Sequence, residues 1–270
     1  MKLAFIGGGN MANALIGGLL GRGVKPGAIS VVEPVTAARR KLAARYGIRA
    51  SAAPDARTAA ADTLLLAVKP QDMRAAVTPL AGSLRGKLVI SIAAGVRLKD
   101  LSRWLGGHAK LIRCMPNTPA LIGAGITGLY APPGVSAAHK RHAERILGAV
   151  GAVVWVQDES LLDPVTAVSA SGPAYVFWFI EQLAKSGQAL GLSPQVSRKL
   201  ALQTVLGAAM LAARSKDPPS VLRERVTSKG GTTEAALRVF EQERLAEHFR
   251  RAVEAASRRG AEMGELLGKD

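Results

Sequence analysis

The stretch Lys2–Leu20 constrains the fold of this 270-residue chain more than any other part of it. It opens with the short apolar run Leu3–Ile6, which is typical of a strand buried on both faces. Three successive glycines interrupt the run, Asn10 stands where a helix cap would stand, and an apolar helical pattern continues over Met11–Leu20. Strand, glycine-rich turn and helix in this order predict the first βα unit of a dinucleotide-binding fold.

The spacing of the small residues fits a bound pyrophosphate. Gly7 would form the tight turn, Gly9 would let the backbone approach the phosphates, and Ala12 would let helix and strand pack closely. The N-terminus of the helix would offer unpaired N–H groups and a partial positive charge. Glycine-rich turns also precede helices that bind nothing, so this segment alone does not establish a dinucleotide site, and the rest of the sequence is needed.

Composition indicates a globular protein of one large domain or two ordinary ones. Hydrophobic residues make up 48% of the chain, and no apolar run approaches the ~20 residues of a membrane-spanning helix. The single cysteine, Cys114, excludes an internal disulfide framework and fits a reducing compartment; we expect it to be a buried, inert thiol. The chain also enters its first strand without a leader-like segment, so we expect a cytoplasmic protein with no membrane partner.

The net charge of +16 does not indicate a nucleic-acid-binding protein. Residues 1–160 carry 21 basic and 8 acidic side chains, whereas residues 161–270 carry 15 and 12. The charge is scattered, and aromatic residues are too few for a stacking platform. The excess in the first half is better explained by solvated surfaces or by attraction of an anionic cofactor.

Apolar runs of strand length alternate with helical patterns through the first half. This alternation predicts a parallel sheet wrapped by helices, with ligands at the carboxyl ends of the strands. The expected strands and extended pieces are Leu3–Ile6, Ile29–Val32, Ile48–Ala50, Thr63–Val68, Leu88–Ile92, Leu111–Cys114, Ile126–Tyr130 and Val153–Val156, with further helices over Val35–Tyr46 and Ser136–Leu147.

Beyond Glu159 only helical patterns remain. We therefore expect an α/β protein with a Rossmann-type dinucleotide-binding domain at 1–158 and an all-α dimerisation and substrate domain at 159–270. The helical segment Tyr175–Ile180 is apolar on every side, and so small a domain cannot bury it alone, so we expect an obligate dimer formed by this half. The expected helices are Leu161–Val168, Pro173–Leu190, Pro194–Arg214, Thr232–Phe240 and Ala246–Leu267.

Two loops in the second half have patterns of their own. Gly230, Gly231, Thr232 and Thr233 lie at a helix start, where backbone N–H groups and a threonine hydroxyl can bind a carboxylate. An ordinary helix cap explains the same pattern. Ser169–Tyr175 forms a sharp helix entry at Pro173, which also fits a cap and a domain hinge.

Together these segments resemble one family over essentially the whole chain, pyrroline-5-carboxylate reductase. The segments are IGGGNMA at 6–12, AVKPQ at 67–71, AAG at 93–95, RCMPNTP at 113–119, SASGPAY at 169–175 and VTSKGGTTEAAL at 226–237. The last is highly specific to that family, whereas the first is shared with many reductases. Ala170 departs from the family, which usually has glycine there.

The resemblance implies reduction of 1-pyrroline-5-carboxylate to L-proline by an NAD(P)H cofactor. It implies a Rossmann domain followed by a dimerising helical domain, with dimers assembling into a decamer in some members. The substrate carboxylate would lie on the segment Gly230–Thr233, across the domain junction from the nicotinamide, with Thr233 as its main side-chain donor and the expected catalytic residue. The cofactor would contact Gly7, Gly9, Asn10, Met11, Ala67, Lys69, Pro70, Ala94 and Asn117.

Cofactor choice depends on opposing charges near the end of the second strand. Glu33 occupies the position of an acid that usually bonds the ribose of NAD, and it would repel a 2′-phosphate. Arg39, Arg40 and Thr36 favour that phosphate, and the family mostly prefers NADPH, so we expect NADPH with appreciable use of NADH. Lys69 is either a solvated charge or a phosphate contact, and its place after a strand favours the contact.

Two other functions remain open at this point. A β-hydroxyacid dehydrogenase would need a lysine on the interdomain helix, where this chain offers Tyr175 and Glu181, with Lys185 further on. A non-catalytic nucleotide-binding protein would not need the segment Gly230–Thr233. No metal-ligand cluster is present in the sequence, and none of the four histidines falls in a recognisable motif: His108, His139, His142 and His248.

Overall fold

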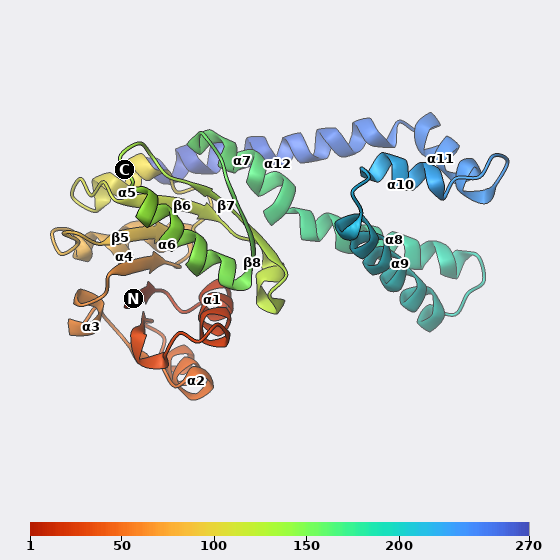
Figure 1. Cartoon of the computed structure of the whole chain (residues 1–270). Helices are drawn as coiled ribbons and strands as arrows, with labels where there is room; N and C mark the ends of the chain where they lie inside the picture. The colour runs from red at the N-terminus through yellow and green to blue at the C-terminus, as the bar shows by residue number, and fades with distance from the viewer. Residues whose placement is uncertain (270) are drawn as a thin grey trace. The chain divides into compact units, whose positions relative to one another are not determined.

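The computed structural model describes residues 1–269 and divides the chain into two compact units. The first unit consists of Met1–Ser171 together with Ala255–Asp270, and the second of Gly172–Glu254. Figure 1 shows the chain coloured from its N-terminus to its C-terminus, with the sheet in the first unit and helices alone in the second.

The first unit is built on an eight-stranded sheet with the order β3-β2-β1-β4-β5-β6-β7-β8. The strands β1, β2, β4 and β5 are buried along their whole length, which is why each is a continuous apolar run rather than an alternating one. The Rossmann-type sheet expected from the sequence is confirmed. The strands are β1 (Leu3–Ile6), β2 (Ile29–Val32), β3 (Arg49–Ser51), β4 (Thr63–Leu66), β5 (Leu88–Ser91), β6 (Leu111–Met115), β7 (Gly125–Tyr130) and β8 (Gly151–Trp155).

One neighbouring pair departs from the parallel sheet predicted from the sequence. The pair β6 and β7 is antiparallel, with Cys114 opposite Leu129, while all other neighbours are parallel. Residues 116–124 join the two strands and include only the short 3-10 helix η4 (Thr118–Ile122). A parallel connection needs a crossover of a dozen or more residues, so this shorter connection reverses the chain. The helix α6 (Ala137–Leu147), which follows β7, is therefore reversed as well.

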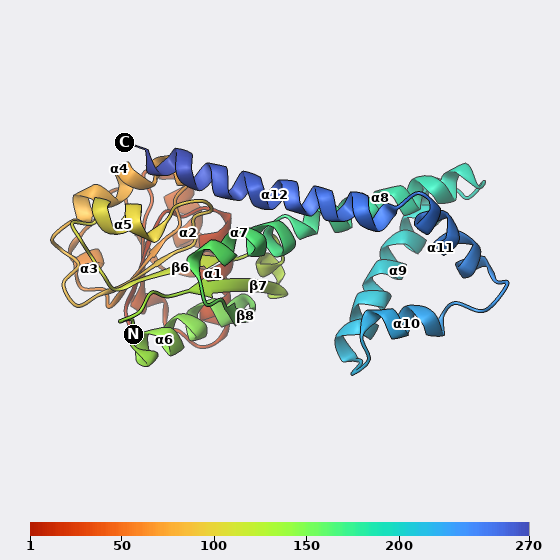
Figure 2. The same cartoon turned by 90° about the horizontal axis from the view of Figure 1, so that it is seen from above.

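Helices cover both faces of the sheet. Leu15 of α1 (Asn10–Gly21), Leu42 of α2 (Thr36–Tyr46) and Ile146 of α6 belong to one buried apolar cluster. Met73 and Leu101, from α4 (Met73–Val77) and α5 (Leu98–Trp104), belong to a second cluster. Figure 2 shows α4 and α5 on one face and α1 and α6 on the other. The short helix α3 (Ala56–Ala59), α4 and α5 were not among the predicted elements.

Residues 159–171 belong with the sheet by their contacts, although the sequence predicts a domain boundary at 158/159. The helix α7 (Leu162–Val165) and the π-helix that follows it (Thr166–Ala170) bury Leu162 and Ala167 completely. A Cβ added to Gly128 of β7 would lie 2.6 Å from Val165, so α7 packs directly on that strand. The predicted boundary marks where the strands end rather than where the compact unit ends, and it stays a prediction.

The second unit is entirely helical in the described residues, as expected. It holds α8 (Gly172–Ala189), α9 (Pro194–Arg214), α10 (Pro219–Arg225), which was not predicted, α11 (Thr232–Gln242), and the first part of α12 (Leu245–Gly268). Among these residues only Ser197 and Ala201 are buried in the single chain. No helix in the described part of the chain is long and apolar enough to cross a membrane.

Gly7 is a position in the expected cofactor loop where the fold requires glycine. Its φ is +99°, and an added Cβ would lie 2.6 Å from the carbonyl oxygen of Ala67. We expect Gly7→Ala to lower the free energy of unfolding by at least about 1–3 kcal/mol, the cost of a strained backbone conformation. Urea unfolding at a fixed protein concentration measures this change.

Gly21→Ala is the matched control, because Gly21 ends the same α1 helix and an added Cβ would meet nothing within 4 Å. We expect this control to be neutral or slightly stabilising. Equal destabilisation by both substitutions would contradict the steric explanation for Gly7.

Candidate functional site

The carboxyl ends of β1, β4, β5 and β6 meet at one edge of the sheet, called the carboxyl edge below. These strands are mutually parallel, so the loops that follow them lie side by side. The structure brings to this edge all nine residues that the resemblance assigns to the cofactor. They are Gly7, Gly9, Asn10 and Met11 after β1, Ala67, Lys69 and Pro70 after β4, Ala94 after β5 and Asn117 after β6.

The glycine loop, Gly7–Gly9, leaves the start of α1 open. The N-cap of α1 is Gly9, which has no side chain to cap the helix. The prediction of Asn10 as the cap is wrong, because Asn10 is already the first helical residue. Asn13 instead fixes the loop from inside the helix, with Nδ2 donating to the carbonyl oxygens of Gly8 at 2.9 Å and Gly9 at 3.0 Å. A Cβ on Gly9 would meet nothing within 4 Å, so there is space against the backbone. Unpaired N–H groups beside open space suit a phosphate group.

Glu33 braces the glycine loop. Its carboxylate accepts one hydrogen bond from the backbone N–H of Gly8 at 3.0 Å and another from that of Val35 at 2.9 Å. The sequence placed this acid against the cofactor's ribose, and in the structure both of its oxygens already have backbone donors. The two backbone donors therefore compensate part of the negative charge of Glu33.

Arg39 places a positive charge beside the same corner. Its guanidinium donates to the carbonyl oxygens of Glu33 at 2.7 Å and Pro34 at 2.6 Å, and to the hydroxyl of Thr36 at 2.9 Å. Arg40, the next residue on α2, is exposed. The corner after β2 thus combines one braced carboxylate with the guanidinium of Arg39, and Arg40 adds a positive charge to the helix that follows, an arrangement that a 2′-phosphate tolerates.

Asn117 connects the loop after β6 to two other segments, one of which lies 52 positions further along the chain. Its Nδ2 donates to the carbonyl oxygen of Ser169 at 3.1 Å, and its Oδ1 accepts from the N–H of Ile126 at 2.9 Å. The side chain is buried, so both ends of the amide are used inside the protein. Asn117 therefore joins the loop after β6 to β7 and to the π-helix, and its role as a cofactor contact stays a prediction.

Lys69 is exposed after β4. In the part of the chain that the structure describes it makes no ion pair, so its ammonium is available to an anion at the carboxyl edge. Ala67 and Ala94 are half-buried and present small side chains where a ligand would approach. The assignments of Lys69, Pro70, Ala67 and Ala94 remain predictions.

The segment Gly230–Thr233 leads into α11 in the helical unit. Gly230 has a φ of +72° and donates its N–H to Glu234 Oε2 at 2.7 Å, while Gly231 is the N-cap and donates its N–H to the carbonyl oxygen of Ser228 at 3.0 Å. Two of the backbone donors expected for a substrate carboxylate are thus already used. Thr232 and Thr233 begin the helix, so their N–H groups lack intrahelical acceptors, and the Thr233 hydroxyl can add a donor.

A buried ion cluster lies below the end of β6, and the sequence alone did not indicate it. Arg113 Nη1 lies 3.0 Å from Glu159 Oε1, Arg113 Nη2 lies 3.7 Å from Asp163 Oδ1, and Arg97 Nη2 lies 2.7 Å from Asp163 Oδ2. Burial lowers the pKa of Arg113, and the charge of Glu159 opposes that effect. The pairs are separated by 46 to 66 positions in the chain, so no local motif could have revealed them.

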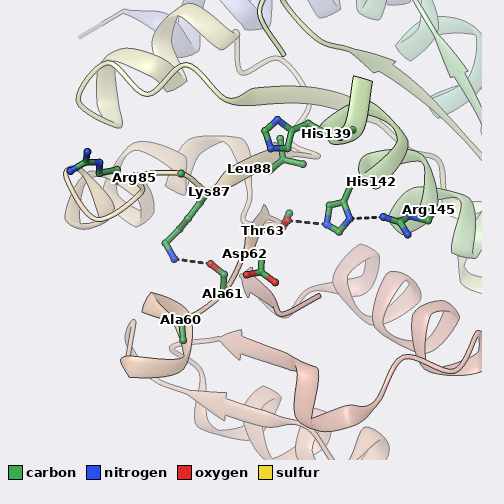
Figure 3. A pocket seen from close by; sticks show the side chains of 12 residues that line it. Ala60, Ala61, Asp62, Thr63, Arg85, Lys87, Leu88, His139, His142 and Arg145 are labelled. Carbon is green, nitrogen blue, oxygen red and sulfur yellow. Dashed lines mark hydrogen bonds between the residues drawn. The ribbon is translucent and has the colours of Figure 1, made fainter. Parts of the chain in front are cut away.

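Two histidines of the first unit lie away from the carboxyl edge, and its cysteine is buried. His108 and His142 bond to the segments that precede β5 and begin β4, at the opposite edge, and burial lowers the pKa of each imidazole. His142 also lines a cavity at this edge, called the amino edge below (Figure 3). Burial also raises the pKa of the Cys114 thiol well above its usual range, which agrees with an inert cysteine. Among residues 1–269 no cluster of side chains is arranged to hold a metal ion. The carboxyl edge therefore offers binding groups rather than an acid–base pair.

Comparison with known proteins agrees with this arrangement. Residues 159–263 match the family model for pyrroline-5-carboxylate reductase dimerisation, and residues 2–95 match that for coenzyme F420-dependent NADP oxidoreductases. A pyrroline-5-carboxylate reductase of Pseudomonas aeruginosa is 45% identical over 99% of this chain and 98% of its own length. One from Arabidopsis thaliana is 36% identical over 98% and 96%.

Solved structures give the same result. A pyrroline-5-carboxylate reductase from Coxiella burnetii has a TM-score of 0.92 at 38% identity, covering 97% of this chain and 98% of its own. A pyrroline carboxylate reductase from Plasmodium falciparum, solved with NADP bound, has a TM-score of 0.86 at 29% identity over 98% of each chain. The family expected from the motifs is thereby confirmed, and the β-hydroxyacid dehydrogenase alternative is set aside. From its sequence and its fold alike, this chain belongs to the pyrroline-5-carboxylate reductase family.

Proposed function

We infer that this chain reduces 1-pyrroline-5-carboxylate to L-proline with NADPH as the hydride donor. The observation that carries this conclusion is that the chain matches pyrroline-5-carboxylate reductases over nearly its whole length. The chain combines a glycine loop before a helix that has no side-chain cap, on a Rossmann sheet, with a Gly-Gly-Thr-Thr segment at the start of another helix. The first suits a dinucleotide phosphate and the second suits a carboxylate.

The first unit holds the cofactor in this proposal. The N–H groups at the start of α1 bind the pyrophosphate, and Lys69 adds a positive charge. The positive charges of Arg39 and Arg40 attract a 2′-phosphate. Open space at Gly9 and the guanidinium groups after β2 support this fit, as does the NADP bound to the Plasmodium falciparum relative. NADH remains usable because it can make the same pyrophosphate contacts, and because Glu33, which would repel a 2′-phosphate, does not repel the ribose hydroxyl of NADH.

The second unit holds the substrate carboxylate through the N–H groups of Thr232 and Thr233 and the hydroxyl of Thr233. When bound, NADPH supplies the hydride that adds to the carbon of the C=N bond. A protonated imine already carries the charge that favours this addition, and the nitrogen keeps its proton in the product. The protein therefore needs to position two reactants and exclude water rather than transfer a proton, and positioning alone can supply several kcal/mol.

The chain assembles as a homo-oligomer through its helical unit, which matches the dimerisation family model. We propose that the dimer is the obligate unit, because Phe177 and Trp178 on α8 are 65% and 58% exposed in the single chain. The decamer implied by the resemblance is the proposed higher assembly. We place the enzyme in the cytoplasm, since its one cysteine is buried and unpaired.

A steady-state assay with 1-pyrroline-5-carboxylate and each reduced nicotinamide tests the function. We expect proline with both cofactors and a higher kcat/KM with NADPH. In the same assay Glu33→Ser should raise the NADPH-to-NADH ratio of kcat/KM about fivefold, since ~1 kcal/mol of like-charge repulsion is removed. Arg40→Gln, which removes a positive charge from the same corner, should lower the ratio. No proline with either cofactor would overturn the function, whereas an unchanged ratio in both variants would overturn only the account of cofactor choice.

The role of Thr233 is tested by removing its hydroxyl. We expect Thr233→Val to reduce kcat/KM for the imine by the equivalent of about 1.5–3 kcal/mol, the range for a hydrogen bond to a charged group. The KM for NADPH should barely change, because the cofactor contacts lie in the other unit. Thr233→Ser keeps the hydroxyl and should keep most of the activity. Wild-type kinetics in Thr233→Val would show that the substrate carboxylate binds elsewhere.

The dimer is tested by analytical ultracentrifugation. At micromolar concentration the wild type should sediment as a dimer or larger species, and Trp178→Asp should shift it toward monomer with loss of activity. Val154→Asp is the control, since Val154 is an exposed apolar residue of β8 in the other unit and should leave the assembly intact. A stable, active wild-type monomer would contradict the proposal.

A further inference from the structure

The last turns of α12 lie against the loop that follows β5, called the β5 loop below (Ala93–Val96). Both belong to the first unit, since Ala255–Asp270 is part of it. Gly95 is buried, although loops usually face solvent. A Cβ added to Gly95 would lie 3.1 Å from Leu267 Cδ1 and 3.4 Å from Met263 Cβ, so α12 covers this residue. Leu267 also packs against the apolar cluster to which both ends of the β5 loop belong.

Three glycines make this close approach of α12 possible. Gly260, Gly264 and Gly268 are four residues apart and therefore lie on one side of the helix, called the glycine face below. Glycine is unfavourable inside a helix, so close packing rather than helix propensity explains the pattern. Gly264 is buried, and an added Cβ would lie 2.7 Å from Arg97 Nε and 3.1 Å from the carbonyl oxygen of Gly95. With any larger residue here, α12 would have to lie further from the β5 loop.

Both sides of the contact at Gly264 are fixed. Arg97 is held by its ion pair with Asp163 at 2.7 Å, and its side chain is only 18% exposed. The last turn of α12 is held on α5, because Arg103 Nη2 donates to the carbonyl oxygen of Gly268 at 3.0 Å. Figure 2 shows this end of the helix beside α5. The position of α12 therefore determines the position of the β5 loop.

The β5 loop lies at the carboxyl edge, on the side of the sheet that suits the nicotinamide half of a dinucleotide. The strand order reverses between β1 and β4, and a Rossmann sheet binds the two halves of a dinucleotide on the two sides of this point. The corner after β2 lies on the adenosine side, so β4 and β5 lie on the nicotinamide side. Ala94, the residue expected to contact the cofactor, precedes Gly95 directly.

We propose that Gly264 is a positioning residue for hydride transfer. It lets α12 hold the β5 loop, and with it the nicotinamide half of NADPH, at the place from which the hydride is transferred. The proposal rests on the proposed function for the identity of the cofactor. A displaced loop changes the distance and angle between the reactants, and a displacement of about 1 Å can cost about a hundredfold in rate.

The test is Gly264→Ala in the full chain, measured by steady-state kinetics and by calorimetric titration with two probes. One probe is NADPH, and the other is 2′-phospho-ADP-ribose, which has the adenosine half of NADPH without the nicotinamide. We expect kcat to fall about tenfold or more and NADPH to bind several-fold more weakly, with the affinity for the fragment unchanged. A general loss of structure would weaken both probes, so the difference between them separates positioning from misfolding.

Gly260→Ala is the matched control on the same glycine face. The nearest atoms to its added Cβ belong to Asp163, at 3.6 Å or more, which is ordinary contact, so we expect wild-type values. Leu267→Ala uncovers Gly95 without adding a clash, and it decides the question if Gly264→Ala folds poorly. It should show the same difference between the probes, with a smaller effect.

Two results would overturn the positioning role of Gly264. One is wild-type kcat and NADPH affinity in Gly264→Ala, and the other is equal weakening of both probes. A wild-type chain that binds NADPH but forms no proline would overturn the proposed substrate alone. The comparison of the two probes would then still decide the role of Gly264, because it needs no imine.

Discussion

The buried cluster of Arg97, Arg113, Glu159 and Asp163 fixes the part of the molecule on which the proposed cofactor site depends. Arg113 lies on β6, Arg97 precedes α5, and the two acids precede or belong to α7, so the cluster holds α7 against the sheet. The chain then continues through the π-helix to Ser169, whose carbonyl oxygen accepts the bond from Asn117. Desolvation offsets much of the attraction between buried charges, so the cluster contributes little net stability. Its effect is geometric, because any other position of α7 would leave a buried charge unpaired.

The helical unit does not bury its own large apolar side chains in the single chain. Its long helices carry large apolar side chains that stay exposed in the single chain, including Phe177 and Trp178 on α8 and Phe249 on α12. Tyr175 and Phe249 do contact each other edge to face, with ring centres 6.0 Å apart, yet such contacts do not form a core. A second copy is the natural source of the missing surface, since the same apolar faces are present on it. The helical unit thus has apolar surface that a second copy can cover, whereas the first unit has a complete core.

The features that could be predicted from the sequence were those encoded by neighbouring residues. Buried strands are continuous apolar runs, so β1, β2, β4 and β5 were predicted, and the glycine loop was evident because strand, turn and helix follow each other directly. The strand β7 was predicted, but its antiparallel direction was missed, because strand direction depends on the length of one connection and not on the strand itself. The ion cluster and the hydrogen bond from Asn117 to Ser169 were missed because the partners lie far apart in the chain. Asn10 was misassigned as the helix cap because asparagine is a preferred N-cap residue. The N-cap in the structure is Gly9, one residue earlier, which has no side chain.

The reversal at β7 also explains why a basic cavity can exist at the amino edge of a sheet of this type. In parallel βα units every helix starts at the carboxyl edge, so the amino edge faces helix C-termini, whose partial negative charge disfavours anions. Here Lys87 Nζ covers one such end by donating to the carbonyl oxygens of Ala59 and Ala61, at 2.5 Å and 2.7 Å. The helix α6 runs the other way because β7 does, and it presents Ala138, His139, His142 and Arg145 along one face. The same short connection that interrupts the parallel order thus changes the electrostatic character of this edge, since the start of α6, followed by Arg145, lies there in place of a helix C-terminus.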